Sequence, residues 1–211
     1  MIYRKIIFIL FTLIALMGTT TLAHSSSLND NYSTLLTKVK NGNTNIDFKA
    51  FRIAYTQTPL YNPYKVDDST QIIRAINEKD YPQMLKYADI ILEKNFTDLD
   101  AHYASMIAYE KLGDQKRFNF HRTVLFKLLD SIIKSGDGKT PETALQVITI
   151  REEYMVMMIL QLRQKSQAIK QIGDKSYDVF EVFDVKNNQP SSVYFDISIP
   201  YSWLNKNLQN K

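Results

Sequence analysis

The sequence predicts an α+β protein with a mainly α-helical N-terminal two-thirds and a small C-terminal antiparallel sheet that carries one helix. Two observations predict this fold class. From residue 32 to residue 140, apolar side chains recur at spacings of three and four, which is the period of amphipathic helices. After Pro141, apolar residues begin to alternate with polar ones, which is the pattern of half-buried strands.

The start of the chain has the organisation of a secretory signal peptide. Arg4 and Lys5 precede an apolar run at residues 6–17, and small residues then lead to Ala23. A charged start, a short apolar middle and a small-x-Ala end are typical of such signals. The run is shorter than the roughly 20 residues that span a bilayer. We therefore expect cleavage after Ala23, no membrane span in the mature chain, and a periplasmic or secreted location.

Amino-acid composition and net charge exclude several classes of function. The chain has no cysteine, which excludes disulfides, a cysteine-linked lipid anchor and cysteine-based chemistry. Loss of residues 1–23 leaves 188 residues with 24 basic and 22 acidic side chains, a net charge of +2. Because no run of Lys and Arg is present, we expect no nucleic-acid partner. An exported protein of this size without disulfides is typical of bacteria.

Capping residues and glycines divide the chain into elements. We expect helices at residues 32–40, 47–55, 67–76, 80–92, 99–112 and 115–134. Two prolines and three large side chains predict an ordered loop at residues 58–64. The regions that follow are a signal peptide at 1–23, a polar lead-in at 24–31, a helical repeat-like region at 32–140, and a sheet region at 141–211 packed on the helical part as one domain.

A turn sequence occurs twice within the helical region. Lys79-Asp80-Tyr81 and Gly113-Asp114-Gln115 lie 34 residues apart. This is the period of a tetratricopeptide repeat, a helix–turn–helix unit. Ala101, Ala104 and Ala108 add a stripe of small residues that lets a neighbouring helix come close. Since no third copy is present, we expect a degenerate tetratricopeptide-like helix pair rather than an array.

The C-terminal third contains the strand signals. Residues 144–150 predict a strand, and residues 152–162 predict a short apolar helix. Residues 177–185 and 193–199 alternate on either side of a polar turn at 186–192, and so predict an antiparallel pair.

The segment Gly136-Asp137-Gly138-Lys139-Thr140 ends like a phosphate-binding loop. Ile133 stands where that loop needs its first glycine, so we expect no nucleotide site. We expect instead a turn after the long helix, with Thr140 as a cap and Pro141 in the next first helical position. The alternative is that this turn directs Asp137 into a binding cleft.

His102 and His121 are the histidines of the folded body. If their helices form a hairpin about Gly113, the two lie about one helical turn apart, and a shared metal site is conceivable. His121 lies in an apolar stripe and no spaced set of ligands accompanies the pair, so we expect no metal.

Glu152 and Glu153 are adjacent carboxylates at a predicted helix start. Adjacent residues on a helix face different ways, so they do not form an acid–base dyad by themselves. Glutamates near a helix N-terminus favour its dipole. A role for either one in a cleft, together with Asp137 or a histidine, stays open.

Several short motifs together resemble a family of exported bacterial proteins catalogued as domain of unknown function 4919. The resemblance covers residues from about Tyr32 to Ile199, and it implies no activity. It implies that the Asn-Pro-Tyr loop, His102 and the Gly-Asp-Gly turn are family hallmarks. The matching motifs are Asp47-Phe48, Phe51-Arg52, Tyr55, Pro59-Leu60-Tyr61-Asn62-Pro63-Tyr64, Ala101-His102, Gly113-Asp114, Ser131-Ile132, Ser135-Gly136-Asp137-Gly138, Glu142-Thr143-Ala144, Glu152-Glu153-Tyr154 and Tyr177-Asp178.

Two function classes remain. We expect a non-enzymatic binding or scaffolding module of the cell envelope, without a cofactor, whose partner is an envelope protein, a peptide or a glycan. The alternative is an envelope hydrolase with a cleft between the helical region and the sheet, in which His102 acts with an acidic residue. The candidate cleft residues are Arg52, Tyr61, Asn62, Tyr64, His102, Asp137, Glu152 and Glu153.

Overall fold

The computed structural model describes residues 31–64 and 67–208. The predicted signal peptide and nearly all of the polar lead-in lie outside the described residues. Within them, no helix combines the length and apolar character needed to cross a membrane. A helix over residues 31–40 comes first. The further elements are α3 (Phe48–Tyr55), α4 (Asp67–Glu78), α5 (Tyr81–Lys94), α6 (Leu99–Lys111), α7 (Gln115–Ile133), a 3-10 turn (Pro141–Thr143), β1 (Leu145–Gln146), α8 (Ile150–Ile159), β2 (Leu162–Ile172), β3 (Lys175–Asp184), β4 (Gln189–Asp196) and α9 (Ser198–Leu208).

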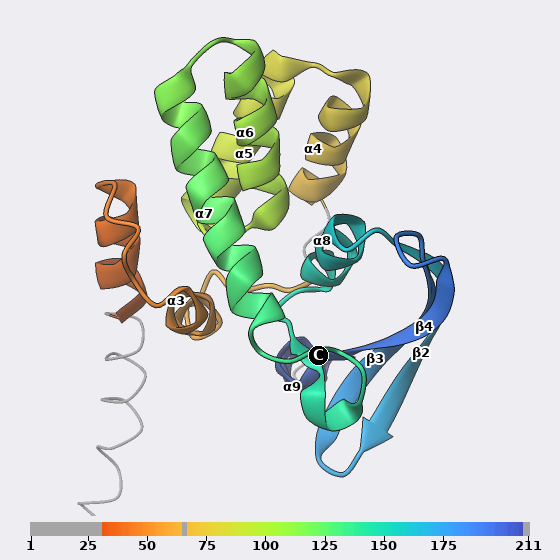
Figure 1. The fold of residues 1–211 in the computed structure, drawn as a ribbon. Helices are drawn as coiled ribbons and strands as arrows, with labels where there is room; N and C mark the ends of the chain where they lie inside the picture. Colours follow the sequence, from red (N-terminus) through yellow and green to blue (C-terminus); the bar gives the residue numbers. More distant parts are fainter. Residues whose placement is uncertain (1–30, 65–66, 209–211) are drawn as a thin grey trace, which may run out of the picture.

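The predicted α+β fold, with a helical N-terminal part and a small sheet near the C-terminus, is confirmed (Figure 1). Each predicted helix before residue 140 is present, and four of them begin at an aspartate whose side chain accepts a backbone N–H bond. Such caps satisfy N–H groups that the helix itself leaves unpaired. The capping aspartates are Asp47, Asp80, Asp98 and Asp114.

Helices α4 to α7 form two consecutive antiparallel hairpins, each helix packed on the next. The turns of the two hairpins are equivalent in detail. Lys79 and Gly113 both have a positive φ, of 55° and 75°. The next residue then donates its N–H to a carbonyl five positions back, from Asp80 to Ala75 at 3.0 Å and from Asp114 to Tyr109 at 2.9 Å. The 34-residue spacing is therefore a real structural repeat.

The sheet differs from the prediction in composition. Its order is β1-β4-β3-β2, and β1 pairs parallel to β4 while the other pairs are antiparallel, so the sheet is mixed. The strand predicted at residues 144–150 is wrong over most of its length, because only two of its residues pair with β4 before the chain turns into α8.

Two elements were missed by the sequence patterns. Strand β2 is an edge strand whose residues after Leu162 are all exposed, so it shows no alternation of apolar and polar residues. The strand predicted at 193–199 ends early at Asp196, whose carboxylate accepts bonds from the N–H and the hydroxyl of Ser198. These bonds turn the chain into α9, which sequence periodicity did not indicate.

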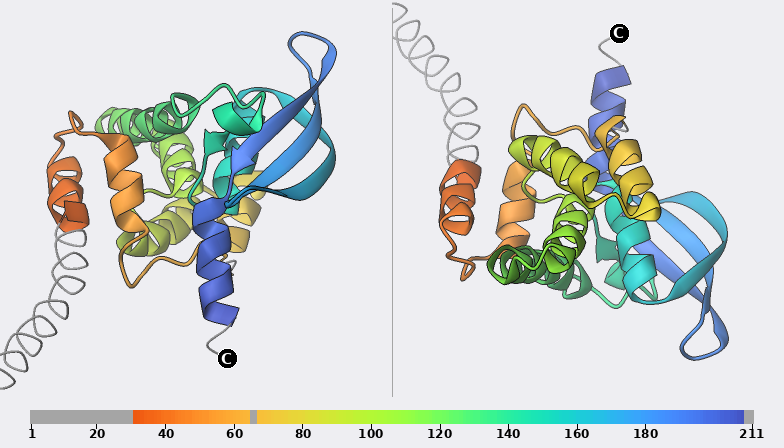
Figure 2. Two further views of the ribbon diagram at one scale, coloured as in Figure 1. Left: turned by 90° about the horizontal axis from the view of Figure 1, so that it is seen from below. Right: turned by 90° about the horizontal axis from the view of Figure 1, so that it is seen from above.

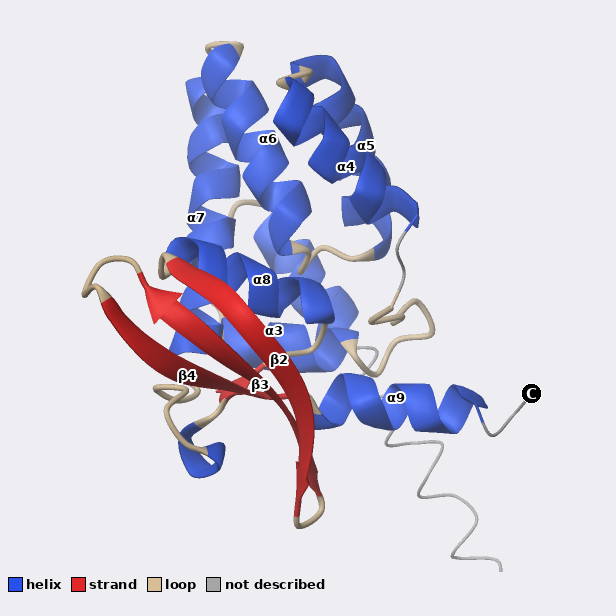
Figure 3. Ribbon diagram, turned by 90° about the vertical axis from the view of Figure 1, so that its right-hand side faces the viewer, coloured by secondary structure: helices blue, strands red, loops and turns tan. Residues whose placement is uncertain are grey.

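Helix α8 lies between the helical hairpins and the curved sheet (Figure 3). It contacts α6 on one side and β2 on the other, while α3 packs against α7. The sheet and α9 project from the helical part in different directions (Figure 2). One continuous hydrophobic core joins these layers and includes Val39, Phe51, Ile72, Leu128, Val156, Phe180 and Phe195.

Replacement of Lys79 by glycine should stabilise the protein. A left-handed conformation costs an L-residue about 1–2 kcal/mol, while glycine loses more chain entropy on folding. We expect Lys79→Gly to raise the free energy of unfolding by about 0.5–1 kcal/mol, measured by urea denaturation. The same substitution within α5, Lys86→Gly, should instead lower it by about 1 kcal/mol. A destabilised Lys79→Gly variant would contradict the strain assigned to this turn.

Candidate functional site

A buried ion pair joins the start of the folded chain to α8. Arg52 of α3 donates from Nε to Glu152 Oε1 at 2.9 Å and from Nη2 to Glu152 Oε2 at 2.6 Å. The two side chains are 1% and 4% exposed. The pair is bidentate, the strongest geometry for an arginine and a carboxylate.

Further bonds complete the surroundings of this pair. Arg52 also donates to the carbonyl of Gln146 at 3.1 Å and to the hydroxyl of Ser131 at 3.3 Å. Glu152 Oε2 accepts the N–H of Ile148 at 2.8 Å. The Tyr61 hydroxyl donates to the carbonyl of Ile148 at 2.6 Å. Three of the predicted site residues, Arg52, Tyr61 and Glu152, therefore meet on the segment that leads into α8.

A second ion pair fixes the first turn of α8 from another direction. Arg151 donates from Nε to Asp100 Oδ2 at 2.7 Å, and the Asp100 side chain is 7% exposed. Asp100 lies in the first turn of α6. Consecutive residues of α8 thus bind α6 through Arg151 and α3 through Glu152.

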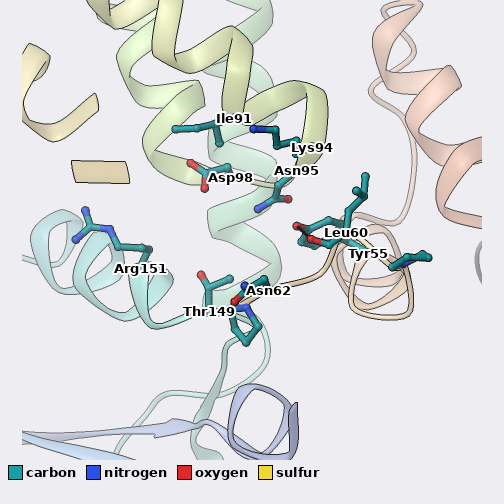
Figure 4. A pocket seen from close by; sticks show the side chains of 11 residues that line it. Tyr55, Leu60, Asn62, Ile91, Lys94, Asn95, Asp98, Thr149 and Arg151 are labelled. Atoms are coloured by element: carbon teal, nitrogen blue, oxygen red, sulfur yellow. Dashed lines mark hydrogen bonds between the residues drawn. The ribbon is translucent and has the colours of Figure 1, made fainter. Parts of the chain in front are cut away.

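A pocket of about 370 Å³ opens beside this junction. Its walls come from the loop after α3, the turn between α5 and α6, and the N-terminal end of α8 (Figure 4). We call it the junction pocket. It is lined by Tyr55, Pro59, Leu60, Asn62, Pro63, Ile91, Lys94, Asn95, Asp98, Thr149 and Arg151.

The two asparagines of the junction pocket are oriented by local bonds. The side-chain oxygen of Asn62 accepts the N–H of Tyr64 at 3.1 Å. The side-chain oxygen of Asn95 accepts both the N–H and the hydroxyl of Thr97, at 3.0 and 2.7 Å. Because each amide uses its oxygen within its own turn, its NH₂ group remains as the unused donor.

Asp98 places a carboxylate in the same pocket. Its Oδ1 caps α6 by accepting the N–H of Ala101 at 2.9 Å, whereas Oδ2 has no hydrogen-bond partner among the described residues. Burial, and then the nearby charge of Asp100, raise the pKa of Asp98 to about 7. The charged form of this carboxyl is therefore disfavoured by its surroundings.

The two histidines lie together but outside the junction pocket. His102 is fully buried, and its Nε2 lies 3.0 Å from the carbonyl of Phe96, so that nitrogen must carry the proton. Its Nδ1 then accepts from Nδ1 of His121, at 3.0 Å. Burial lowers the pKa values of His102 and His121 to about 3 and about 4. Both ring nitrogens of His102 are thus hydrogen-bonded, and neither bonds to Asp137, Glu152 or Glu153.

The structure also separates Asp137 and Tyr64 from the pocket. Asp137 is exposed and accepts bonds from the N–H of Lys139 at 3.1 Å and the hydroxyl of Thr143 at 2.6 Å. A Cβ at Gly136 would lie 2.0 Å from the carbonyl oxygen of Thr143, so only glycine fits there. The predicted cap at Thr140 takes the form of a capping box with Thr143. The ring of Tyr64 contacts Trp203, at 6.1 Å between centroids.

Glu153 forms the second buried carboxylate arrangement of α8. It is fully buried, and neither of its oxygens has a hydrogen-bond partner among the described residues; the carboxyl of Asp178 on β3 is the charge that acts on it most strongly. Burial and the charge of Asp178 raise the pKa of Glu153 to about 9. Because burial and a neighbouring carboxylate both disfavour its charge, Glu153 keeps its proton at neutral pH.

Comparison with known protein families shows the family to which this chain is related. The family described as Domain of unknown function (DUF4919) matches residues 22–206. The chain belongs to this family. The resemblance expected from the short motifs is thereby confirmed. Comparisons with curated proteins and with solved structures found no match.

Sequence reasoning found only one lining residue of the junction pocket, Asn62. It missed Asn95, Asp98, Thr149 and Arg151, whose roles depend on contacts between distant segments. One local signal was present, because the polar run Asn95-Phe96-Thr97-Asp98 precedes an apolar helix and so marks Asp98 as a cap.

The Glu153–Asp178 pair predicts a loss of stability with rising pH. The pKa of Glu153 is raised in the folded state, so the folded protein binds this proton more tightly than the unfolded chain does between about pH 4.5 and pH 9. By linkage, its contribution to stability falls as the pH rises through this window. Glu153→Gln keeps the shape, removes the titration and can donate to Asp178.

We expect Glu153→Gln to raise the free energy of unfolding at pH 8 by about 1–3 kcal/mol, with a smaller gain at pH 5. Urea denaturation across the pH range measures this difference. Glu181→Gln, at an exposed position on β3, is the matched control and should follow the wild type. Parallel pH profiles for Glu153→Gln and the wild type would show that Glu153 ionises freely in the folded protein.

Proposed function

We propose that this protein is a non-enzymatic binding module of the bacterial cell envelope and that the junction pocket is its ligand site. The observation that carries the proposal is the set of unused polar groups in that pocket. The Asn62 and Asn95 amides have spare donors, and Asp98 has a spare acceptor. The Thr149 hydroxyl likewise makes no capping bond to α8.

The supports of this site are rigid, as a binding site requires. The loop wall is held by the bond from Tyr61 to Ile148, and the α8 wall by the pairs Arg52–Glu152 and Arg151–Asp100. Apolar lining next to a few oriented polar groups is the usual composition of a small-molecule pocket. A ligand that supplied the missing partners would gain bonds without ordering the site first.

A second candidate function rests on Asp98. A carboxyl group with a pKa of about 7 is suited to general acid–base work near neutral pH. An envelope hydrolase would then use Asp98, with the guanidinium of Arg151 beside the reacting group. His102, which the sequence offered for this role, has both ring nitrogens engaged elsewhere.

The envelope location rests on residues 1–23. When the full chain is expressed in a bacterium, we expect the mature protein to start at His24 and to appear outside the cytoplasm. Intact mass and N-terminal sequencing of the periplasmic and secreted fractions test this. Ala23→Arg should block cleavage, because the site requires a small residue. A wild-type chain that keeps residues 1–23 in the cytoplasm would contradict export.

Filling the junction pocket should abolish ligand binding. Thr149→Trp places a large side chain in the pocket without removing a capping bond. In a fragment screen by saturation-transfer NMR, we expect wild-type binders to be lost in Thr149→Trp. They should be kept in Thr37→Trp, an exposed site on the first helix. Binders that survive Thr149→Trp, or an absence of binders, would contradict this site.

A further inference from the structure

One carboxylate of the junction pocket forms no ion pair with the described residues. Arg52 is paired with Glu152, and Arg151 is paired with Asp100, at N–O distances of 2.6 and 2.7 Å. Asp98 takes part in no ion pair among the described residues, and its Oδ2 accepts no hydrogen bond. Asp98 as a whole is partly exposed and lines the pocket. The pocket therefore presents a carboxylate that has no ion-pair partner among the described residues, with the charge of Arg151 nearby.

The neighbours of this oxygen are donors. Figure 4 shows Asn95 beside Asp98, with Asn62 and Thr149 on the opposite side of the opening. Neither asparagine NH₂ group donates a hydrogen bond within the described part of the chain, and both amide oxygens are already used. These donors suit a carbonyl oxygen on the ligand. The site thus has one position for a cation and, next to it, positions for oxygen acceptors.

Part of the lining is apolar, although Lys94 and Tyr55 also border the pocket. Leu60 is 57% exposed and Ile91 is 8% exposed. Together with Pro59 and Pro63 they form a wall suited to an aliphatic side chain. An aliphatic group on this wall would gain about 25 cal/mol for each Å² of apolar surface that it removes from water. A sugar ring carries hydroxyls on its edges, and these hydroxyls would find no hydrogen-bond partner on this apolar wall.

We propose that the junction pocket binds an α-ammonium group flanked by a carbonyl and an aliphatic side chain, as found in an apolar amino acid or at the N-terminus of a peptide that begins with one. The ammonium pairs with Asp98, the carbonyl oxygen accepts from the asparagine amides, and the side chain packs on Leu60 and Ile91. This inference rests on the proposed function, since it names the ligand of that same pocket.

The protonation behaviour of the pocket supports this assignment. The groups that face Asp98 are Asp100 on its own helix, Arg151 and Glu152 on α8, Tyr55 on α3 and Lys94 on α5. Burial and Asp100 raise the pKa of Asp98 to about 7, and a bound ammonium would favour its ionised form. An α-amino group has a pKa of about 8. Affinity should therefore be greatest between about pH 7 and pH 8 and fall on both sides.

Calorimetry on the mature protein with leucine and three of its derivatives tests the proposal. Leucinamide carries the ammonium and the carbonyl, N-acetyl-leucinamide lacks the ammonium, and leucyl-alanine extends the chain as a peptide. We expect leucinamide to bind at least tenfold more tightly than its acetylated form. If leucyl-alanine binds more tightly than leucinamide and leucine, the ligand is a peptide N-terminus. If leucine binds best, the ligand is the free amino acid.

The matched variants are Asp98→Asn and Asp89→Asn. Asparagine caps a helix as well as aspartate does, so Asp98→Asn keeps α6 intact while it removes the charge. It should weaken leucinamide binding at least tenfold and abolish the weakening below pH 7. Asp89→Asn, at an exposed position on α5, should leave both unchanged. Thermal unfolding of each variant confirms that the fold is retained.

Two results would overturn the proposal. One is equal binding of leucinamide and N-acetyl-leucinamide, or equal binding by the wild type and Asp98→Asn. The other is no binding of any leucine derivative at millimolar concentration. If fragments still bind the wild type and not Thr149→Trp, the proposed function stands and only the ligand class is wrong. If no fragment binds either, both fail.

Discussion

The buried pair Arg52–Glu152 is the interaction on which the rest of the structure depends. It joins residues 100 positions apart, one near the start of the folded chain and one on the helix beneath the sheet. Removing two such charges from water is expensive, and it is offset only when every remaining donor and acceptor is satisfied. The backbone of Gln146 and Ile148 and the hydroxyl of Ser131 meet that condition here. The pair therefore fixes where α8 begins relative to α3 and α7.

Two adjacent carboxylates in the first turn of α8 lie in different environments. Glu152 faces Arg52 and the N–H of Ile148, whereas the adjacent Glu153 faces β3 and the carboxyl of Asp178. One charge is compensated, and the other group keeps its proton. Adjacent helical positions point about 100° apart, so a single turn can hold an ion pair on one side and a protonated carboxyl on the other. The junction with the helical part and the junction with the sheet thus begin at neighbouring residues.

Features that depend on residues close together in the sequence could be predicted, whereas features that depend on contacts between distant segments could not. Caps such as Asp80 and Asp114 and the turn repeat at Lys79 and Gly113 depend on residues within one helical turn, and the sequence predicted them. Strand β2 depends on pairing with β3, and its own exposed residues carry no alternation, so it was missed. The junction pocket was missed because Asp100 and Arg151 meet across 51 positions. Arg52, Tyr61 and Glu152 were suspected from the motifs, but only the structure shows that they support the pocket rather than line it.

Asp98 caps helix α6 and also places a carboxyl group in the junction pocket. One carboxylate oxygen satisfies the first turn of α6, and the other accepts no hydrogen bond from the described residues. Asparagine would cap the helix equally well, so capping alone does not explain a group that carries a charge into a half-buried site. Desolvation of this charge raises the pKa of Asp98. The ionised form is unfavourable unless a cation binds next to it. A cationic ligand would relieve this cost, and the folded protein would then be most stable with its ligand bound. The need for a helix cap therefore accounts for one oxygen of Asp98, and the ligand proposed for the junction pocket would account for the other.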